Sequence, residues 1–562
     1  MKKKILSVVL CGLLLLGGCG SVADSEKEPG LSAAEYEAAM EEAKTTPYGK
    51  YPELVTYTLA KMSAANNSNM PEGDTYENNA YTRYLKELLN IQNVDVFEEK
   101  DDQYYITVDM AIASGEIPDI MVVKDAETVA RLYEMDMIED LTLVYENCAS
   151  QVIKDIYASY GKRIFEPVTF DGKLMAMPET SISDGPNLIW LRQDWMDRLG
   201  LSAPKTIEDL VEVVRAFIRE NPGGNEPGET VGIMCNTDLC GENGISLEYQ
   251  LDILFAGFGA FPKQWVYDED EKVSYGSVQP QAKEALAYIH QLYEEGIIDQ
   301  NFLLRTDTNI VDMIVSGKCG SFFGPWWAPN NPLVDAVSAD PEADWQPYLI
   351  ATAENGATYY HSQNPAYKYV VVRKGFEYPE IVPKMISVIF DYSRYEDVDN
   401  EELSAYFTQN VDPTARPVAI NVDYNSGLRR CYLSLMNAFG GKTTYEEMPL
   451  LERSYYTACK AYLEKGQEAT AQEWAAYESR IEACSLLNGK NIIDVESLYL
   501  GETETMRNVW WKLQELENQA YLKIVCGEED ISYFDTFVEQ WLSMGGEQIV
   551  EEVTVELEED EG

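Results

Sequence analysis

The apolar positions along the chain recur with two different spacings. Short β-branched runs such as Asp119–Val123 (DIMVV) and Lys368–Lys374 (KYVVVRK) predict buried strands. Longer stretches with apolar residues every three or four positions predict amphipathic helices. Strands that alternate with helices are typical of α/β folds. At 562 residues the chain is too long for one core, so the sequence predicts an α/β protein of two or more lobes.

Two helices carry clear start and stop signals. In the first, Thr206 is an expected N-cap with Asp209 three residues later, and Asn221 with the following Pro-Gly-Gly ends the helix. Its predicted apolar face consists of Ile207, Leu210, Val211, Val214, Phe217 and Ile218. The second helix is expected from Pro280 to Gly296, and residues 428–519 are predicted to be mainly helical. Residues 554–562 are acidic and are predicted to form a frayed tail.

The N-terminus predicts export. Three lysines precede an apolar run from Ile5 to Leu16, which is the pattern of a secretory signal, and residues 1–18 are expected to be that signal peptide. The tetrapeptide LGGC ending at Cys19 resembles the bacterial lipobox, which implies a diacylglycerol on the Cys19 thiol. The alternative is an ordinary signal peptide whose cysteine is accidental. Residues 19–45 are polar and are predicted to be a lipidated flexible tether. No other apolar run approaches about 20 residues, so we expect anchoring at the extracytoplasmic face of the bacterial cell membrane.

The charge balance limits the partners. Lys and Arg number 43 and Asp and Glu number 96, for a formal net charge of −53, which argues against nucleic acid and favours a neutral or cationic ligand. No cofactor is predicted. The two histidines, His290 and His361, and the absence of a CxxC motif argue against a metal site. Cys235 and Cys240 are the one local pair of cysteines with a disulfide to test.

Six segments resemble, in the same order, the extracellular solute-binding proteins of family 1, in particular the lipoprotein branch that serves carbohydrate ABC transporters. They are Met110–Val123, Val168–Thr180, Leu188–Phe217, Ala285–Leu303, Ser316–Trp327 and Leu513–Val553. The resemblance implies a two-lobed periplasmic-binding-protein-like fold (type II) with an interlobe cleft and hinge. By position, lobe 1 would take residues 46–175 and 359–411, and lobe 2 residues 176–358 and 412–553. A calcium loop of many relatives reads ENPGGNEPGET here, so no metal is predicted from the resemblance.

The same resemblance implies a function. The protein would capture an oligosaccharide or related small solute and deliver it to the permease subunits of an ABC importer, with no catalysis. Two other readings stay open, namely an exported glycoside-active enzyme and a surface receptor for peptides or sensing. No nucleophile motif such as GxSxG supports the enzyme.

Sugars bind through C–H faces on aromatic rings and through hydroxyls on polar side chains, so the candidate residues combine both types. Trp326 and Trp327 are adjacent in a Gly-Pro turn, and one ring is expected to face the ligand while the other packs beneath it. The further candidates, each with a purely structural role as the alternative, are Asp74, Asn78, Asn79, Lys124, Asp125, Glu179, Ser181, Asp184, Trp265, Tyr360 and His361.

Overall fold

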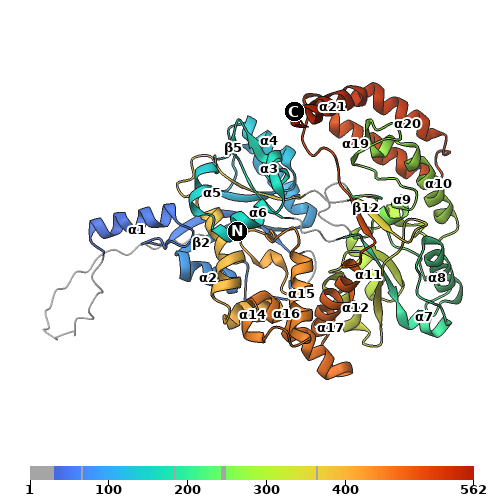
Figure 1. The fold of residues 1–562 in the computed structure, drawn as a ribbon, viewed down its shortest axis with the longest axis horizontal. Coiled ribbons are helices and arrows are strands. Elements are labelled where there is room, and N and C mark those ends of the chain that lie inside the picture. Colours follow the sequence, from blue (N-terminus) through green and yellow to red (C-terminus); the bar gives the residue numbers. More distant parts are fainter. Residues whose placement is uncertain (1–30, 65–67, 181–184, 242–247, 362–364, 562) are drawn as a thin grey trace, which may run out of the picture.

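The computed structural model describes residues 31–64, 68–180, 185–241, 248–361 and 365–561. Figure 1 shows two α/β lobes side by side, with α2 and α4 in one lobe and α8 and α10 in the other. Helices α14 to α17 lie along the lower edge of both lobes in this view. Across the described residues, no helix combines the length and apolar character needed to cross a bilayer.

Lobe 1 is built on a five-stranded sheet. In sheet order its strands are β2 (Ile91–Lys100), β1 (Val55–Ser63), β3 (Ile120–Val123), β13 (Tyr369–Val372) and β6 (Met177–Pro178). β1 is parallel to β2 and β3, whereas β13 is antiparallel to its neighbours. The predicted strands at 119–123 and 368–374 are confirmed as β3 and β13, and all their residues are buried. The helices of this lobe are α2 (Ala80–Leu89), α3 (Asp101–Ser114), α4 (Ala126–Glu134), α5 (Thr142–Cys148), α6 (Gln151–Ala158), α13 (Ile381–Ser387) and α14 (Glu401–Thr408).

Lobe 2 has a smaller antiparallel sheet of β10 (Ser321–Gly324), β7 (Leu188–Arg192) and β11 (Trp345–Tyr348). Around it lie α7 (Gln193–Leu199), α8 (Ile207–Glu220), α9 (Asp252–Ala256), α10 (Pro280–Glu294), α11 (Asp307–Val315), α12 (Val334–Ala339), α19 (Glu504–Val525), α20 (Tyr533–Trp541) and α21 (Glu547–Glu561). Helix α8 confirms its predicted signals, with a Thr206–Asp209 capping box and a left-handed Asn221 at its end. Helix α10 begins at Pro280 and ends before Gly296, as predicted.

Four helices that follow α14 of lobe 1 and precede α19 of lobe 2 in the chain bridge the lobes. They are α15 (Gly427–Phe439), α16 (Leu450–Lys465), α17 (Ala471–Tyr477) and α18 (Cys484–Leu487), with a π-helical turn at Glu478–Ala483 between the last two. α16 packs on α14 of lobe 1, and α17 packs on α12 of lobe 2. Two strands near the crossings, β12 (Thr358–His361) and β14 (Ile492–Val495), pair in parallel.

Two terminal predictions are wrong. The predicted flexible tether contains helix α1 (Ala33–Thr45), because its Ala, Glu and Lys residues favour helices and Ser32 and Glu35 form a capping box. Figure 1 shows α1 projecting from lobe 1 on the side away from lobe 2. The predicted frayed tail is helical to Glu561, because α21 buries Ile549 and Val553 in the core of lobe 2. The described cysteines, Cys235 and Cys240 included, are free thiols, and all of them except Cys526 are buried.

Candidate functional site

Polar residues gather at the carboxyl edge of the lobe 1 sheet. β3 ends at Val123, and its partner Tyr369 begins β13 directly after Lys368. Tyr369 also faces Pro178 of β6, which Glu179 follows. Ligands of open α/β sheets bind outside the carboxyl ends of strands. Glu179 and Lys368 therefore lie at the carboxyl edge of the sheet, where we expect a ligand to bind.

Glu179 ties together three chain segments that meet at the lobe boundary. Its side chain is 2% exposed, and Lys368 Nζ lies 3.3 Å from its Oε2. The Asn421 backbone N–H donates to Glu179 Oε1 at 2.9 Å. Arg416 Nη1 donates in turn to Asn421 Oδ1 at 2.7 Å. A chain of charged and amide groups thus runs from β6 and β13 to residues 416–421.

A second group, of two aromatic rings and a guanidinium, joins the bridging helices to lobe 2. The Arg480 guanidinium carbon lies 4.2 Å from the Trp326 ring centroid and 4.0 Å from that of Tyr455. Arg480 Nη2 donates to the Tyr455 hydroxyl at 2.7 Å. Burial raises the pKa of Tyr455, while the positive charges of Arg480 and Arg416 act in the opposite direction. Tyr455 therefore lies within the electrostatic reach of both arginines.

We call this set the lobe junction; it consists of Glu179, Lys368, Arg416, Asn421, Tyr455, Arg480 and Trp326. It draws on β6, β13 and residues 416–421 on the lobe 1 side, on the bridging helices, and on the turn after β10 in lobe 2. Of these seven residues, only Glu179 and Trp326 are among the sequence candidates. The rest carry no local motif, because they converge from segments far apart in the chain.

The two tryptophans of the turn after β10 are buried unequally. Trp326 is 6% exposed, and among the described residues its Nε1 has no hydrogen-bond partner. Trp327 is partly exposed and packs at the margin of the same apolar cluster. Which of the two rings meets a ligand stays a prediction.

The loop before α2 uses its candidate residues within the fold. Asn79 is fully buried, caps α2 by accepting from the Tyr81 N–H, and donates to the Ala415 carbonyl. Asp74 accepts from Arg83 at 2.9 Å and from the Tyr406 hydroxyl. Burial opposes the ionisation of Asp74, but these hydrogen bonds hold its pKa below the usual value. Asn78 is exposed and accepts from Arg83 at 3.2 Å.

The candidates after β3 also have structural partners. Asp125 caps α4 by accepting from the Thr128 N–H at 2.7 Å. Lys124 is exposed, with its Nζ 4.0 Å from Asp125 Oδ2. Ser181 and Asp184, like Cys19, lie outside the described residues.

The remaining candidates lie in lobe 2 and at the crossing strands. Trp265 in β8 (Trp265–Tyr267) is 4% exposed and stacks on Trp510, with ring centroids 6.2 Å apart. In β12, Tyr360 pairs with Asp494 of β14. The neighbouring His361 Nε2 lies 3.2 Å from Asp252 Oδ1. None of these three residues contributes to the lobe junction as defined above.

In the segment after α8, where the family resemblance implies a calcium loop in many relatives, amide side chains make the hydrogen bonds that hold the loop together. Asn221 Nδ2 donates to the Asn225 carbonyl at 2.6 Å, and Asn221 Oδ1 accepts from the Thr230 hydroxyl at 2.6 Å. Asn225 Nδ2 donates to the Gly317 carbonyl at 2.9 Å. The Asn221 amide oxygen and the Asn225 and Gly317 carbonyl oxygens thus accept hydrogen bonds from within the protein, whereas a calcium site needs oxygen ligands that face the ion. Among the described residues, no group of three or more His, Cys, Asp or Glu side chains is arranged to hold a metal.

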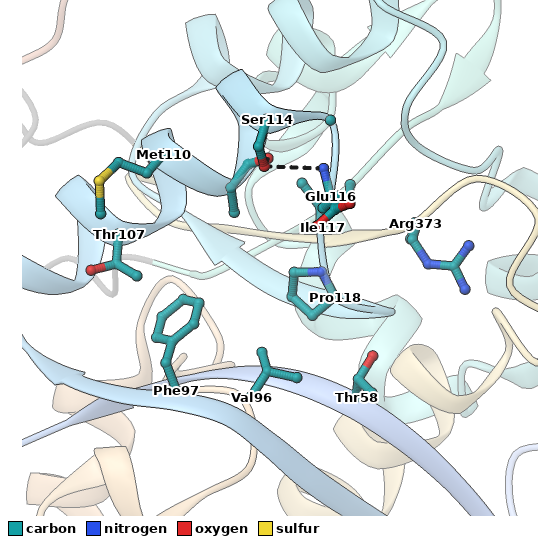
Figure 2. Close-up of a pocket in the computed structure, with 12 residues that line it drawn as sticks. Thr58, Val96, Phe97, Thr107, Met110, Ser114, Glu116, Ile117, Pro118 and Arg373 are labelled. Carbon is teal, nitrogen blue, oxygen red and sulfur yellow. Dashed lines mark hydrogen bonds between the residues drawn. The ribbon is translucent and has the colours of Figure 1, made fainter.

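A separate hollow of 660 Å³ lies on lobe 1. Figure 2 shows Val96, Phe97 and Thr58 on one side and Thr107 and Met110 of α3 on the other. It opens at the amino end of β3, the edge opposite to the lobe junction. Its lining Arg373 is already paired with Asp119 at 2.6 Å. We assign no ligand to this hollow.

Comparisons with known proteins agree with the two-lobed fold. The family model described as bacterial extracellular solute-binding protein matches residues 79–362, about half of the chain. The polygalacturonan/rhamnogalacturonan-binding protein YtcQ of Bacillus subtilis (strain 168) is 24% identical over 489 residues, which are 84% of this chain and 87% of YtcQ. The fructooligosaccharide ABC transporter substrate-binding protein FusA of Streptococcus pneumoniae serotype 4 is 26% identical over 235 residues, 39% of this chain and 41% of FusA.

Solved structures show the same fold. The alginate-binding protein AlgQ2 without calcium matches with a TM-score of 0.59 at 15% identity, over 90% of this chain and 98% of AlgQ2. FusA of S. pneumoniae in complex with kestose matches with a TM-score of 0.58 at 15% identity, over 90% of this chain and 99% of FusA. The fold is the type II solute-binding fold with two α/β lobes. The family match and the fold together show that this chain belongs to the bacterial extracellular solute-binding proteins.

Proposed function

We propose that this protein captures an oligosaccharide between its two lobes, outside the cell membrane, and delivers it unchanged to the permease of an ABC importer. Family membership supports solute binding, and YtcQ and FusA are named for binding poly- or oligosaccharides. The observation that carries the proposal is the lobe junction itself, where Asn421 donates to Glu179 at the carboxyl edge of the lobe 1 sheet and Trp326 of lobe 2 contacts Arg480 of the bridging helices.

The physical basis is the dual surface of a sugar. Its C–H face lies against a rigid aromatic ring, and its hydroxyls exchange hydrogen bonds with charged or amide side chains. Trp327 offers the partly exposed ring, and Glu179, Lys368 and Asn421 offer the polar groups. Closing the lobes over the ligand would bury both surfaces.

The proposed lobes follow residues 46–175 and 359–411 for lobe 1, and 176–358 and 412–553 for lobe 2. One boundary needs adjustment, since Ala415, Val418, Ala419, Ile420 and Val422 pack in the lobe 1 core. We therefore move the boundary between the lobes that was predicted between residues 411 and 412 to a position after Val422.

Anchoring through Cys19 is part of the proposal. A diacylglycerol at that cysteine, followed by α1, would hold the lobes at the membrane surface near the permease. Replacing Cys19→Ser should release the protein into the culture medium, as measured by immunoblotting of medium and membrane fractions. Equal retention of the wild type and this variant in the membrane fraction would contradict lipid anchoring.

The binding function is tested by thermal denaturation with a panel of oligosaccharides. A ligand at a hundredfold excess over its Kd should stabilise the protein by about 2.7 kcal/mol. Chromatography of the same mixtures should return the oligosaccharide intact. Release of shorter sugars would show that the protein is a glycoside-active enzyme and not a binding protein. A panel in which no sugar stabilises the protein would refute the proposal.

A further inference from the structure

The buried and partly buried arginines of this chain fall into two groups. Arg192, Arg394 and Arg453 each have a carboxylate partner: Asp194 at 2.7 Å, Asp423 at 2.8 Å and Asp399 at 2.7 Å, respectively. That pattern is the expected one, because a desolvated cation is costly without an anion. With 96 Asp and Glu in the sequence, carboxylates are abundant.

Arg416 and Arg480 of the lobe junction differ from this pattern. Among the residues that the structure describes, neither has a carboxylate within ion-pair distance. The Nε atoms of both are buried, and within the described ranges neither has a hydrogen-bond partner. Arg416 makes its polar contacts to the Ile420 carbonyl and the Asn421 amide oxygen, both neutral acceptors. Two positive charges thus stand near Tyr455 without a neutralising carboxylate.

The Arg480 side chain is also held in a fixed orientation. Trp326 and Tyr455 both contact the guanidinium, with ring centroids 4.2 and 4.0 Å from its central carbon. The hydrogen bond from Nη2 to the Tyr455 hydroxyl fixes its rotation. An immobilised planar fork has already lost the entropy that binding would cost, and its geometry matches a carboxylate better than a single hydroxyl.

We propose that Arg480, with Arg416 as a second positive charge, forms a subsite for the carboxylate of an acidic sugar, so that the solute is an oligosaccharide containing hexuronate. This inference rests on the proposed oligosaccharide-binding function and adds the chemical class of the ligand. The ring of the same sugar unit would contact the aromatic groups around Arg480, while its carboxylate supplies the anion that the protein itself does not provide.

The test compares ligands that differ only in charge. Trisaccharides of galacturonate, mannuronate and guluronate, their fully methyl-esterified forms and neutral maltotriose and kestose are titrated by calorimetry against the full mature protein. At least one hexuronate should bind, and its methyl ester should bind roughly 10- to 100-fold more weakly, as expected for losing a charge-assisted hydrogen-bonded pair. Equal affinity for an acid and its ester, or binding of neutral sugars alone, would overturn the carboxylate subsite and leave the proposed function standing.

Variants locate the subsite. Arg480→Gln should lower the affinity for the acid to that of the ester and leave the affinity for the ester unchanged. Arg480→Lys, which keeps the charge and loses the fork, should fall between the two. Arg429→Gln on α15 removes the same charge from an exposed position and should bind like the wild type.

Three further outcomes keep the test decisive. If Arg480→Gln unfolds, as judged by circular dichroism, the Lys variant and the acid-to-ester ratio of the wild type still decide the question. If Arg480→Gln loses acid and ester equally, Arg480 is a structural residue and the inference is wrong. If none of the sugars binds to the wild type, the function proposed above fails first.

Discussion

Glu478 provides a test of how burial sets the charge near the lobe junction. It lies on the same π-helical turn as Arg480 and is 2% exposed. Burial raises the pKa of Glu478 to about 8, and the nearby carboxylates of Glu482 and Asp344 add to the effect. The carboxyl group is therefore mostly neutral at pH 7. The substitution Glu478→Gln keeps the shape of the side chain and removes its titratable carboxyl group.

The direction in which the free energy of unfolding changes with pH follows from proton binding. In the unfolded chain the pKa of this group returns to its ordinary value of 4.5. Between that value and about 8, the folded state binds more protons than the unfolded state, so the free energy of unfolding falls as pH rises. At about 1.4 kcal/mol per pKa unit, the loss is about 3 kcal/mol by pH 7 and about 5 kcal/mol above pH 8.

The Glu478→Gln variant does not lose this unfolding free energy as the pH rises, because its side chain does not titrate. Glu478→Gln and the wild type should have similar unfolding free energies at about pH 5, and the variant should be more stable by about 3 kcal/mol at about pH 7. Urea unfolding monitored by tryptophan fluorescence at several pH values measures the difference. A variant that is less stable than the wild type at high pH, or a difference independent of pH, would refute the reasoning.

Glu473→Gln on the neighbouring helix α17 is the matched control with the opposite sign. Burial acts against the ionisation of Glu473, but Lys465 and the Thr470 cap hold its pKa below the ordinary value. Its ionised form therefore stabilises the fold above its unfolded pKa, and this contribution is lost in acid. The variant should be less stable than the wild type at neutral pH and approach it as the pH falls.

Three further predictions concern packing and cysteine chemistry. Trp326→Ala should lower the free energy of unfolding by about 3–5 kcal/mol, measured by chemical denaturation, because the ring is almost fully buried. Trp327→Ala should lower the free energy of unfolding by less and should weaken oligosaccharide binding, which calorimetry measures. Ile549→Ala in α21 should lower the free energy of unfolding by about 2–5 kcal/mol in the same denaturation assay. An unchanged free energy of unfolding would show that the C-terminal segment does not pack in the core and is a frayed tail. Alkylation of the denatured, unreduced protein should label both Cys235 and Cys240 by mass spectrometry, and protection of this pair until reduction would show a disulfide.

The sequence predicted those elements whose signals are local. Helix α8 has its cap, its apolar face and its stop within one stretch, and the buried strands β3 and β13 are continuous apolar runs. The polar composition of residues 19–45 predicts a flexible tether and does not reveal helix α1, because Ala, Glu and Lys occur in tethers and are also strong helix formers. Helix α21 was missed because its acidic residues outnumber the two that are buried, Ile549 and Val553.

The site was predicted less completely for a physical reason. Glu179 and Trp326 lie in segments with recognisable patterns, and both reach the lobe junction. Arg416, Tyr455 and Arg480 belong to helices and loops whose sequences look ordinary. Their significance comes from a missing carboxylate and from two rings stacked on one guanidinium, and these are properties of the folded arrangement alone.

The same distinction limits what net charge can predict about the ligand. A total of −53 favours a neutral or cationic ligand only if the charge at the site resembles the average over the surface. Surface charges more than about 8 Å away are largely screened at physiological ionic strength, so the nearest groups dominate. At the lobe junction Glu179 is paired with Lys368, whereas Arg416 and Arg480 have no carboxylate within ion-pair distance among the described residues. The raised pKa of Glu478 keeps the carboxyl group on the Arg480 turn largely uncharged at neutral pH. The proposed hexuronate subsite therefore depends on the distribution of charge within the fold and is compatible with a negative net charge.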